Sequence, residues 1–148
     1  MIIREARDSD IDAVAELERM CFKDPYPREL LLMLRSLYPE LFLVIEIDNK
    51  IVGYVSALVR TERIGHIVSI CIHPDHRRRG LGTLLMKNVE ERLKKIFGLC
   101  KIRLEVRVSN YAAINMYRKL GYTIATILYN YYPDGEDAYL MIKNVCED

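Results

Sequence analysis

The strongest constraint on the fold is a basic, glycine-containing turn that joins a strand pattern to a helix pattern. The apolar run at 64–72 predicts a strand, and apolar residues then recur at helical spacing from Leu81 to Ile96. Between them, residues 77–82 read RRRGLG. Glycine lets a backbone approach a ligand closely, and the unpaired N–H groups of a first helical turn attract anions. We therefore expect a phosphate-binding turn here.

Two common phosphate-binding motifs do not match this turn. A Walker loop needs GxxxxGK followed by Ser or Thr, which the chain lacks. The dinucleotide motif GxGxxG needs a third glycine where Leu85 stands. The observed pattern is RxxGxG. A solvated basic turn with a glycine at the helix start is the alternative interpretation of the same residues.

The rest of the chain predicts an α+β fold. Residues 102–108 alternate apolar and charged side chains with the period of two that is typical of a strand. Asn110 can cap a helix that ends at Leu120, and Glu18 interrupts the apolar stripe of the first predicted helix. The other predicted elements are strands at 1–6, 41–47, 51–61, 122–129 and 138–144, a helix capped by Asp8 or Ser9, and a helix at 29–37. The order βααβββαβαββ indicates a mixed sheet with one βαβ crossover at its centre.

Composition limits the class of protein. A chain of 148 residues, 51% hydrophobic and 29% charged, predicts one globular domain over 1–148. The 22 basic and 21 acidic residues nearly balance, which argues against a nucleic-acid coat protein or a polybasic membrane binder. No apolar run approaches the ~20 residues of a membrane span, and no signal peptide opens the chain. We therefore expect a cytoplasmic protein that binds neither nucleic acid nor a membrane.

The four cysteines are widely separated, and none forms a CxxC pair. This spacing excludes a zinc knuckle and a thioredoxin-like motif. Without an export signal, we expect a reduced chain in which each cysteine acts as a small buried hydrophobe.

The RxxGxG turn between a strand and a helix resembles the coenzyme A pyrophosphate loop of the GNAT acetyltransferases, whose element order is also βααβββαβαββ. The resemblance covers nearly the whole chain. It implies a GNAT fold, an α/β-sandwich-like mixed sheet of about seven strands with four helices. It also implies acetyl-CoA as cosubstrate, no metal, and a bulge in the strand before the loop that splays it from its neighbour. The residues that would contact coenzyme A are Ile70, Cys71 and Ile72 on that strand and Arg77, Arg78, Arg79, Gly80, Leu81, Gly82 and Thr83 in the loop.

The segments LEVRVSN and NMYRKLGY, between residues 104 and 122, resemble those of the RimI-type N-terminal acetyltransferases. The resemblance implies that Glu105 is the general base, that Asn110 contacts coenzyme A, and that Tyr117 protonates the departing thiolate. The chemistry is consistent with these roles, because amide formation from a thioester needs a neutral amine and a proton for the sulfur. A peptide α-amine, with a pKa near 7.7–8.0 against about 10.4 for lysine, needs less help from a base.

The identity of the base stays open between two residues. Arg103 and Arg107 share the strand face of Glu105, and their charges should lower the pKa of that carboxyl, which favours a water-mediated or orienting role. His66 is the second candidate, since archaeal N-terminal acetyltransferases have a histidine at this place in a GHIVSI-like strand. As alternatives, Glu105 is a surface carboxylate paired to arginine, His66 is structural and Tyr117 is a core residue.

Two further chemistries receive less support. His66 and Glu105 could share a metal ion, but two ligands make a poor metal site. A ping-pong transfer through an acetylated Cys71 needs a thiol with a lowered pKa, and nothing near it in the sequence provides that. We therefore expect direct transfer in a ternary complex.

The chain has ten tyrosines and no tryptophan, and five of the tyrosines lie between residues 122 and 139. The string YYPDGEDAYLM at 131–141 resembles the YYxDGEDAYxM segment of archaeal and eukaryotic N-terminal acetyltransferase catalytic subunits. The resemblance implies that Tyr131, Tyr132 and Tyr139 line a peptide groove opposite Tyr26, which lies in a loop between two prolines. Ordinary hairpin aromatics are the alternative. Some relatives have a glutamate where this chain has Asp24, which leaves its part in substrate selection open.

Together these patterns predict a protein N-terminal α-acetyltransferase that uses acetyl-CoA and acts on the N-termini of proteins or nascent peptides, with ribosomal proteins among the candidate targets. The alternatives are a GNAT enzyme for lysine side chains or small-molecule amines, and a CoA-binding subunit of a larger complex.

Overall fold

Seven strands form one mixed sheet in the computed structural model, which describes residues 1–146. The strand order is β1-β2-β3-β4-β5-β7-β6, with β4 and β5 parallel and every other neighbouring pair antiparallel. The strands are β1 (Ile2–Glu5), β2 (Phe42–Ile47), β3 (Lys50–Val59), β4 (Gly65–Ile72), β5 (Lys101–Arg107), β6 (Thr123–Leu128) and β7 (Ala138–Asn144). The helices are α1 (Ile11–Cys21), α2 (Arg28–Leu37), α3 (Leu81–Lys95) and α4 (Tyr111–Lys119), with 3-10 turns at Asp8–Asp10, Pro39–Leu41 and Pro74–His76. This arrangement confirms the predicted element order and mixed sheet.

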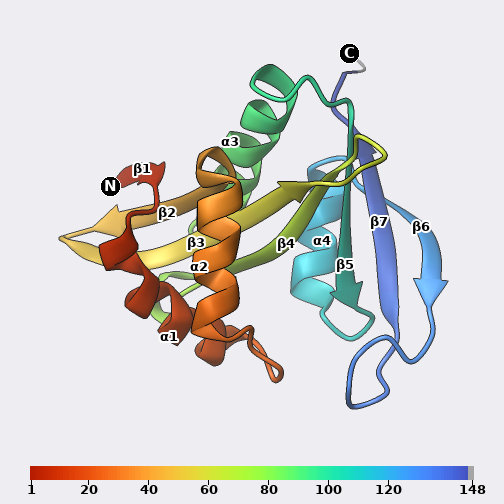
Figure 1. Ribbon diagram of the computed structural model, residues 1–148. Helices are drawn as coiled ribbons and strands as arrows, with labels where there is room; N and C mark the ends of the chain where they lie inside the picture. Colours follow the sequence, from red (N-terminus) through yellow and green to blue (C-terminus); the bar gives the residue numbers. More distant parts are fainter. Residues whose placement is uncertain (147–148) are drawn as a thin grey trace.

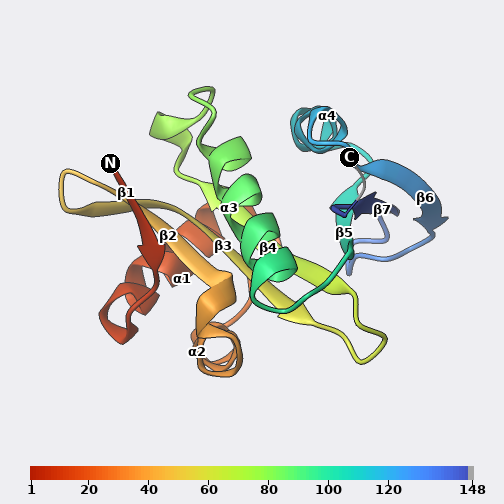
Figure 2. The same cartoon turned by 90° about the horizontal axis from the view of Figure 1, so that it is seen from above.

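The helices cover both faces of the sheet (Figures 1 and 2). One apolar cluster joins α3 and α4 to one face, and a second joins α1 and α2 to the other. In Figure 2, α3 and α4 lie above the strands and α1 and α2 below them. Among the described residues, no helix is both long and apolar enough to cross a membrane.

The central parallel pair, β4 and β5, stays together for only a short distance. The register pairs Gly65 with Ile102 and His66 with Arg103 and extends no further among the described residues. Beyond that point the two strands diverge (Figure 1). The divergence confirms the splayed strand that the family resemblance implies.

A bulge in β4 lies just beyond this last pair. Ala57 of β3 is opposite Ile67, but Ser56 is opposite Ser69, so that Val68 is an extra residue. An extra residue reverses the alternation of side chains along a strand. As a result, the adjacent residues Val68 and Ser69 lie on the same face: Val68 packs with the cluster under α1, and Ser69 Oγ donates to Glu18 of α1.

Local signals set most of the element boundaries. The Asn110 side chain accepts a hydrogen bond from the Ala113 N–H at 3.3 Å and so caps α4, as predicted. The strand predicted at 51–61 ends earlier, at Val59. A turn begins there, in which Arg60 N–H donates to Ile64 O at 2.9 Å and Arg63 has a positive φ of 61°.

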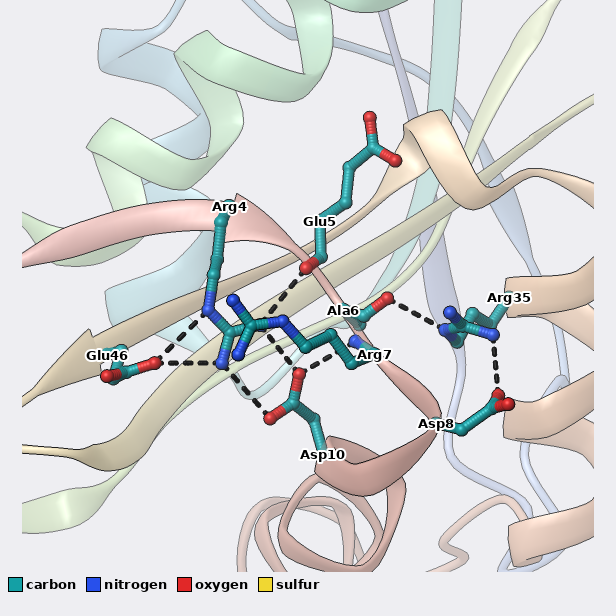
Figure 3. A network of polar contacts seen from close by, with 8 residues as sticks. All are labelled: Arg4, Glu5, Ala6, Arg7, Asp8, Asp10, Arg35 and Glu46. Atoms are coloured by element: carbon teal, nitrogen blue, oxygen red, sulfur yellow. Dashed lines mark hydrogen bonds and ion pairs between the residues drawn. The ribbon is translucent and has the colours of Figure 1, made fainter.

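A polar network fixes the N-terminal strand to the helices that follow it (Figure 3). Arg4 forms ion pairs with Asp10 at 2.7 Å and Glu46 at 2.8 Å. Arg35 of α2 donates to Ala6 O at 2.7 Å and pairs with Asp8 at 2.6 Å. These contacts join β1, β2, α1 and α2 at one corner of the sheet.

The cysteines contradict the expectation of four reduced, buried side chains. Cys21 forms a disulfide with Cys71, and Cys100 forms one with Cys146. Cys71 is buried and Cys21 half-buried, but Cys100 and Cys146 are exposed. No local pattern indicates these bonds, because the bonded cysteines are 50 and 46 residues apart and meet only when strands and helices pack.

Candidate active site

The divergence of β4 and β5 brings together two of the predicted catalytic residues. His66 lies in the last paired position of β4, and Glu105 lies two residues beyond its partner Arg103 on β5. His66 Nε2 and Glu105 Oε1 are 2.8 Å apart. Both side chains are on the sheet face that α1 and α2 cover, as the alternation along each strand requires. A carboxylate and an imidazole therefore meet at the point where the sheet opens.

Opposing effects act on the charge of Glu105. Its side chain is only 9% exposed, and burial alone would raise its pKa. Hydrogen bonds from His66 and Arg103, together with the charge of the arginine, outweigh burial, so that the pKa of Glu105 lies below its ordinary value. Arg103 provides two of these contacts, at 2.8 and 3.1 Å to Oε2. Glu105 is therefore an ionised hydrogen-bond acceptor at neutral pH.

The contact on the far side of the histidine indicates its tautomer. Arg60 Nη1 lies 3.5 Å from His66 Nδ1. Because guanidinium can only donate, this contact favours a lone pair on Nδ1 and a proton on Nε2. In that state His66 donates to Glu105 and orients it.

Tyrosines from two loops gather around this pair. The Tyr131 hydroxyl is 3.4 Å from Glu105 Oε1, and the rings of Tyr131 and Tyr132 meet edge to face at 5.0 Å. Burial, and then the charges of Glu18 and Glu105, raise the pKa of Tyr26. The Tyr26 hydroxyl therefore lies near the carboxylate of Glu105. Tyr26 and Tyr131 remain partly exposed. The structure therefore brings three of the four predicted substrate tyrosines together.

Tyr139 does not join this group. On β7 it is opposite Val106 of β5, whereas Glu105 is opposite Leu140. Directly opposed residues point to the same face of a sheet, so Tyr139 shares the face of buried Val106 and packs against the core under α3 and α4. It faces away from Glu105.

Arg107 connects the two loops that carry the tyrosines. Its guanidinium pairs with Asp24 of the α1–α2 loop at 3.2 Å and with Asp134 and Glu136 of the β6–β7 loop at 2.9 and 2.8 Å. It also lies 4.0 Å from the centre of the Tyr132 ring, within cation–π range. Contrary to expectation, Arg107 therefore directs its charge to the loops, and Arg103 provides the arginine contact to Glu105.

Tyr117 lies on the other face of the sheet. It is buried in the cluster under α3 and α4, with its ring 5.9 Å from that of Tyr122. Burial, and to a lesser extent Tyr132, raise the pKa of Tyr117 well above its ordinary value. The phenol therefore keeps its proton at neutral pH.

The turn before α3 has the backbone expected of an anion-binding loop. Gly80 caps the helix with φ of 78°, and Arg78 also has a positive φ, of 65°. Gly82 lies against another side chain, since a Cβ added there would be 2.9 Å from Met116 Sδ. The first turn of α3 contains no acidic residue. These features suit a phosphate group at the free N–H groups of Leu81 and its neighbours.

The predicted strand contacts for coenzyme A, Ile70, Cys71 and Ile72, lie on β4 beyond its last pair with β5. Arg77 Nε donates to Ile72 O at 3.0 Å, which connects the strand end to the loop. The Cys71 sulfur is in a disulfide, and this removes the thiol that an acetyl-cysteine route would require. Among residues 1–146, no group of three or more His, Cys, Asp or Glu side chains is placed to hold a metal ion.

Two residues near the site had not been assigned a role. Arg60 contacts His66 from a hairpin, and no sequence signal indicated this approach. Glu18 is a buried carboxylate that donors from three elements contact. Glu18 interrupts the apolar stripe of its helix, and this interruption is the sequence signal that could have identified it.

Comparison with known proteins gives the family. Residues 11–122 match the acetyltransferase (GNAT) family. An uncharacterized N-acetyltransferase of Methanocaldococcus jannaschii is 46% identical over 143 residues, which are 97% of this chain and 91% of that protein. An N-alpha-acetyltransferase of Sulfurisphaera tokodaii is 37% identical over 150 residues, covering 94% of this chain and 90% of the relative. The crystal structure of Ard1 from Thermoplasma volcanium superposes with a TM-score of 0.93 at 31% identity, covering 99% of this chain and 98% of that one. This chain belongs to the acetyltransferase (GNAT) family, which confirms the resemblance seen in its motifs.

Proposed function

We propose that residues 1–148 act as one domain that transfers the acetyl group of acetyl-CoA to the N-terminal α-amine of proteins or nascent peptides. The observation that carries this proposal is the hydrogen-bonded pair of His66 and Glu105, 2.8 Å apart at the opening of the sheet with Tyr131 beside it. The N-alpha-acetyltransferase of Sulfurisphaera tokodaii supports the same reaction.

The reaction requires movement of two protons. The amine nitrogen forms a bond with the acetyl carbonyl carbon, the carbon–sulfur bond breaks, the nitrogen loses a proton and the sulfur gains one. Glu105 accepts the proton from the amine, directly or through one water, because it is the ionised acceptor of the pair. His66, with its Nε2 proton directed at Glu105, holds the carboxylate in place. A peptide α-amine is partly neutral near pH 7, so a carboxylate of lowered pKa is a sufficient base.

Tyr117 is the proposed donor to the sulfur. It lies on the opposite sheet face from Glu105, so a reaction that uses both must take place where β4 and β5 diverge. A neutral phenol near a departing thiolate is a suitable acid, since the raised pKa of Tyr117 keeps the proton available.

The remaining site residues bind the two substrates. The residues from Arg77 to Thr83 are proposed to hold the pyrophosphate, with the strand edge at Ile70, Cys71 and Ile72, beyond the last pair with β5, along the pantetheine arm and Asn110 nearby. Tyr26, Tyr131 and Tyr132 are proposed to hold the peptide main chain, because tyrosine combines a flat apolar ring with a hydroxyl that bonds any backbone.

Two matched peptides test this function. One has a free α-amine and no lysine, and the other has a blocked N-terminus and a single lysine. With acetyl-CoA, mass spectrometry should show one added acetyl group on the first peptide and little on the second. Acetylation of the lysine peptide alone, or tight acetyl-CoA binding without turnover on any peptide, would contradict the proposal.

A further inference from the structure

We propose that Glu18 is a positioning residue, which fixes the loop carrying Tyr26 in relation to the bulged strand β4. The inference rests on the proposed function, in which that loop holds the peptide and β4 holds acetyl-CoA. Glu18 lies in α1, one helical turn before the loop begins, and contacts neither proposed substrate itself.

Glu18 is a fully enclosed carboxylate. Its relative exposure is 1%, and within residues 1–146 no Lys, Arg or His forms an ion pair with it. Burying a carboxylate is costly unless donors satisfy it. Glu18 accepts hydrogen bonds from the Tyr54 hydroxyl, from Ser69 Oγ at 2.7 Å and from the Tyr26 N–H at 2.9 Å. Its two oxygens therefore both have donors, and one of these donors is a backbone N–H, which can only donate.

These three donors come from the parts of the proposed site that have to stay aligned. Tyr54 is on β3, and Ser69 is the first residue after the bulge of β4. Tyr26 carries one of the aromatic rings near Glu105. One carboxylate therefore joins the peptide loop to the strand beside the splayed opening.

The two prolines of the loop make the Tyr26 contact unusually important. Pro25 and Pro27 have no N–H, so Tyr26 provides the one main-chain donor between residues 25 and 27. That donor bonds Glu18 Oε2, while Oε1 accepts from Tyr54 and Ser69. The Tyr54 and Ser69 hydroxyls lie 2.8 Å apart and can bond each other, whereas the Tyr26 N–H can only donate. Removing the carboxylate therefore leaves this stretch of loop without its hydrogen bond to the helix.

The arrangement of α1 on β4 supports the same conclusion. Residues 18 and 21 are three apart on one face of the helix, and residues 69 and 71 are two apart on one face of the strand. Glu18 bonds Ser69, and Cys21 is bonded covalently to Cys71. The helix end is thus fixed to the strand at two points, and the Tyr26 N–H extends this attachment into the loop.

The test compares Glu18→Leu with Tyr54→Phe. Leucine is close to glutamate in size but has no acceptor, so the Tyr26 N–H loses its partner, whereas a glutamine could turn its amide oxygen to Tyr26 and its NH₂ to the two hydroxyls. Tyr54→Phe removes a donor to the same carboxylate and leaves the Tyr26 contact intact, so it controls for a general loss of stability. We expect Glu18→Leu to raise the peptide KM about tenfold, since small displacements of substrate-positioning groups have effects of up to about 10²-fold. The KM for acetyl-CoA should change less than about twofold, and Tyr54→Phe should lower Tm without the rise in peptide KM.

Hydrogen exchange provides a measurement that does not depend on activity. In the wild-type protein the Tyr26 amide should exchange much more slowly than the amide of Lys23, an exposed residue of the same loop, and Glu18→Leu should remove that difference. A Tyr26 amide that exchanges as fast as that of Lys23 in the wild-type protein would overturn the inference, even if Glu18→Leu fails to fold. Equal rises of peptide KM in Glu18→Leu and Tyr54→Phe would also overturn it. Failure of the wild-type protein to acetylate any α-amine would refute the proposed function, while the exchange result would still decide the role of Glu18.

Discussion

His66 Nε2 lies 2.8 Å from Glu105 Oε1, across the last paired position of the two strands that diverge at the centre of the sheet. Both side chains project from the same sheet face, at the point where the backbone pairing of β4 and β5 ends. Arg60 and Arg103 contact the two outer ends of the pair. The result is an ionised carboxylate in a fixed orientation, facing loops that carry tyrosines.

Removing either member of this pair should impair catalysis. Glu105→Gln should lower kcat by about 10²-fold, the usual contribution of a general base. His66→Gln should cost less, because the histidine acts by orienting the carboxylate. Since the two act as a unit, the double variant should be no worse than Glu105→Gln. Steady-state kinetics with Glu91→Gln, an exposed carboxylate on α3 that pairs with Lys95, controls for loss of charge. Independent effects that multiply in the double variant would contradict the pairing.

Replacing the proposed acid should slow the step that releases the thiol. We expect Tyr117→Phe to lower kcat by about 10-fold to 10²-fold, with little change in either KM, because only the proton is removed. Tyr111→Phe is the matched control, since Tyr111 lies on the same helix and is exposed. A Tyr117→Phe variant with the wild-type kcat would show that Tyr117 is a packing residue only.

The left-handed backbone at Gly80 should make this position sensitive to substitution. Nothing lies within 4 Å of a Cβ added at Gly80, so the cost of Gly80→Ala comes from its φ of 78°. That cost is about 1–2 kcal/mol in the free energy of unfolding. Gly80→Asn should cost less, because asparagine tolerates this conformation. Denaturant unfolding measures both variants, and equal costs would show that the backbone conformation is not the cause.

The network at the N-terminal corner predicts a loss of stability in acid. The hydrogen bond from Arg4 holds the pKa of Asp10 below its ordinary value, so Asp10 stabilises the fold above the unfolded-state pKa of about 3.9. The contribution disappears as the pH falls through the lower, folded-state pKa. Asp10→Asn should therefore reduce the free energy of unfolding by about 1–3 kcal/mol at neutral pH. The difference from wild type should shrink below about pH 4. A constant difference across the whole pH range would contradict this account.

Much of the architecture could be predicted because each element carries its own signal. The alternation along β5, the cap at Asn110 and the glycine turn before α3 each depend on neighbouring residues. The bulge in β4 was implied by resemblance to the family, since the sequence GHIVSICI does not show which residue is extra. The end of β3 was predicted two residues late, because the turn at 60–63 contains neither glycine nor proline.

Other features depend on register and packing, which a single sequence does not display. Tyr139 was grouped with Tyr131 and Tyr132, but its pairing with Val106 directs it to the other face. Arg107 shares a face with Glu105, yet carboxylates from two distant loops bind it. Both disulfides also join segments that are far apart in the chain.

The most direct test of the central claim uses one peptide that carries both a free α-amine and an internal lysine. The peptide is incubated with acetyl-CoA at neutral pH, and tandem mass spectrometry then assigns the position of each acetyl group. We expect the wild-type protein to modify the α-amine and leave the lysine free, and the Glu105→Gln variant to lose most of this product. Acetylation mainly at the lysine, or equal α-amine acetylation by the Glu105→Gln variant, would contradict it.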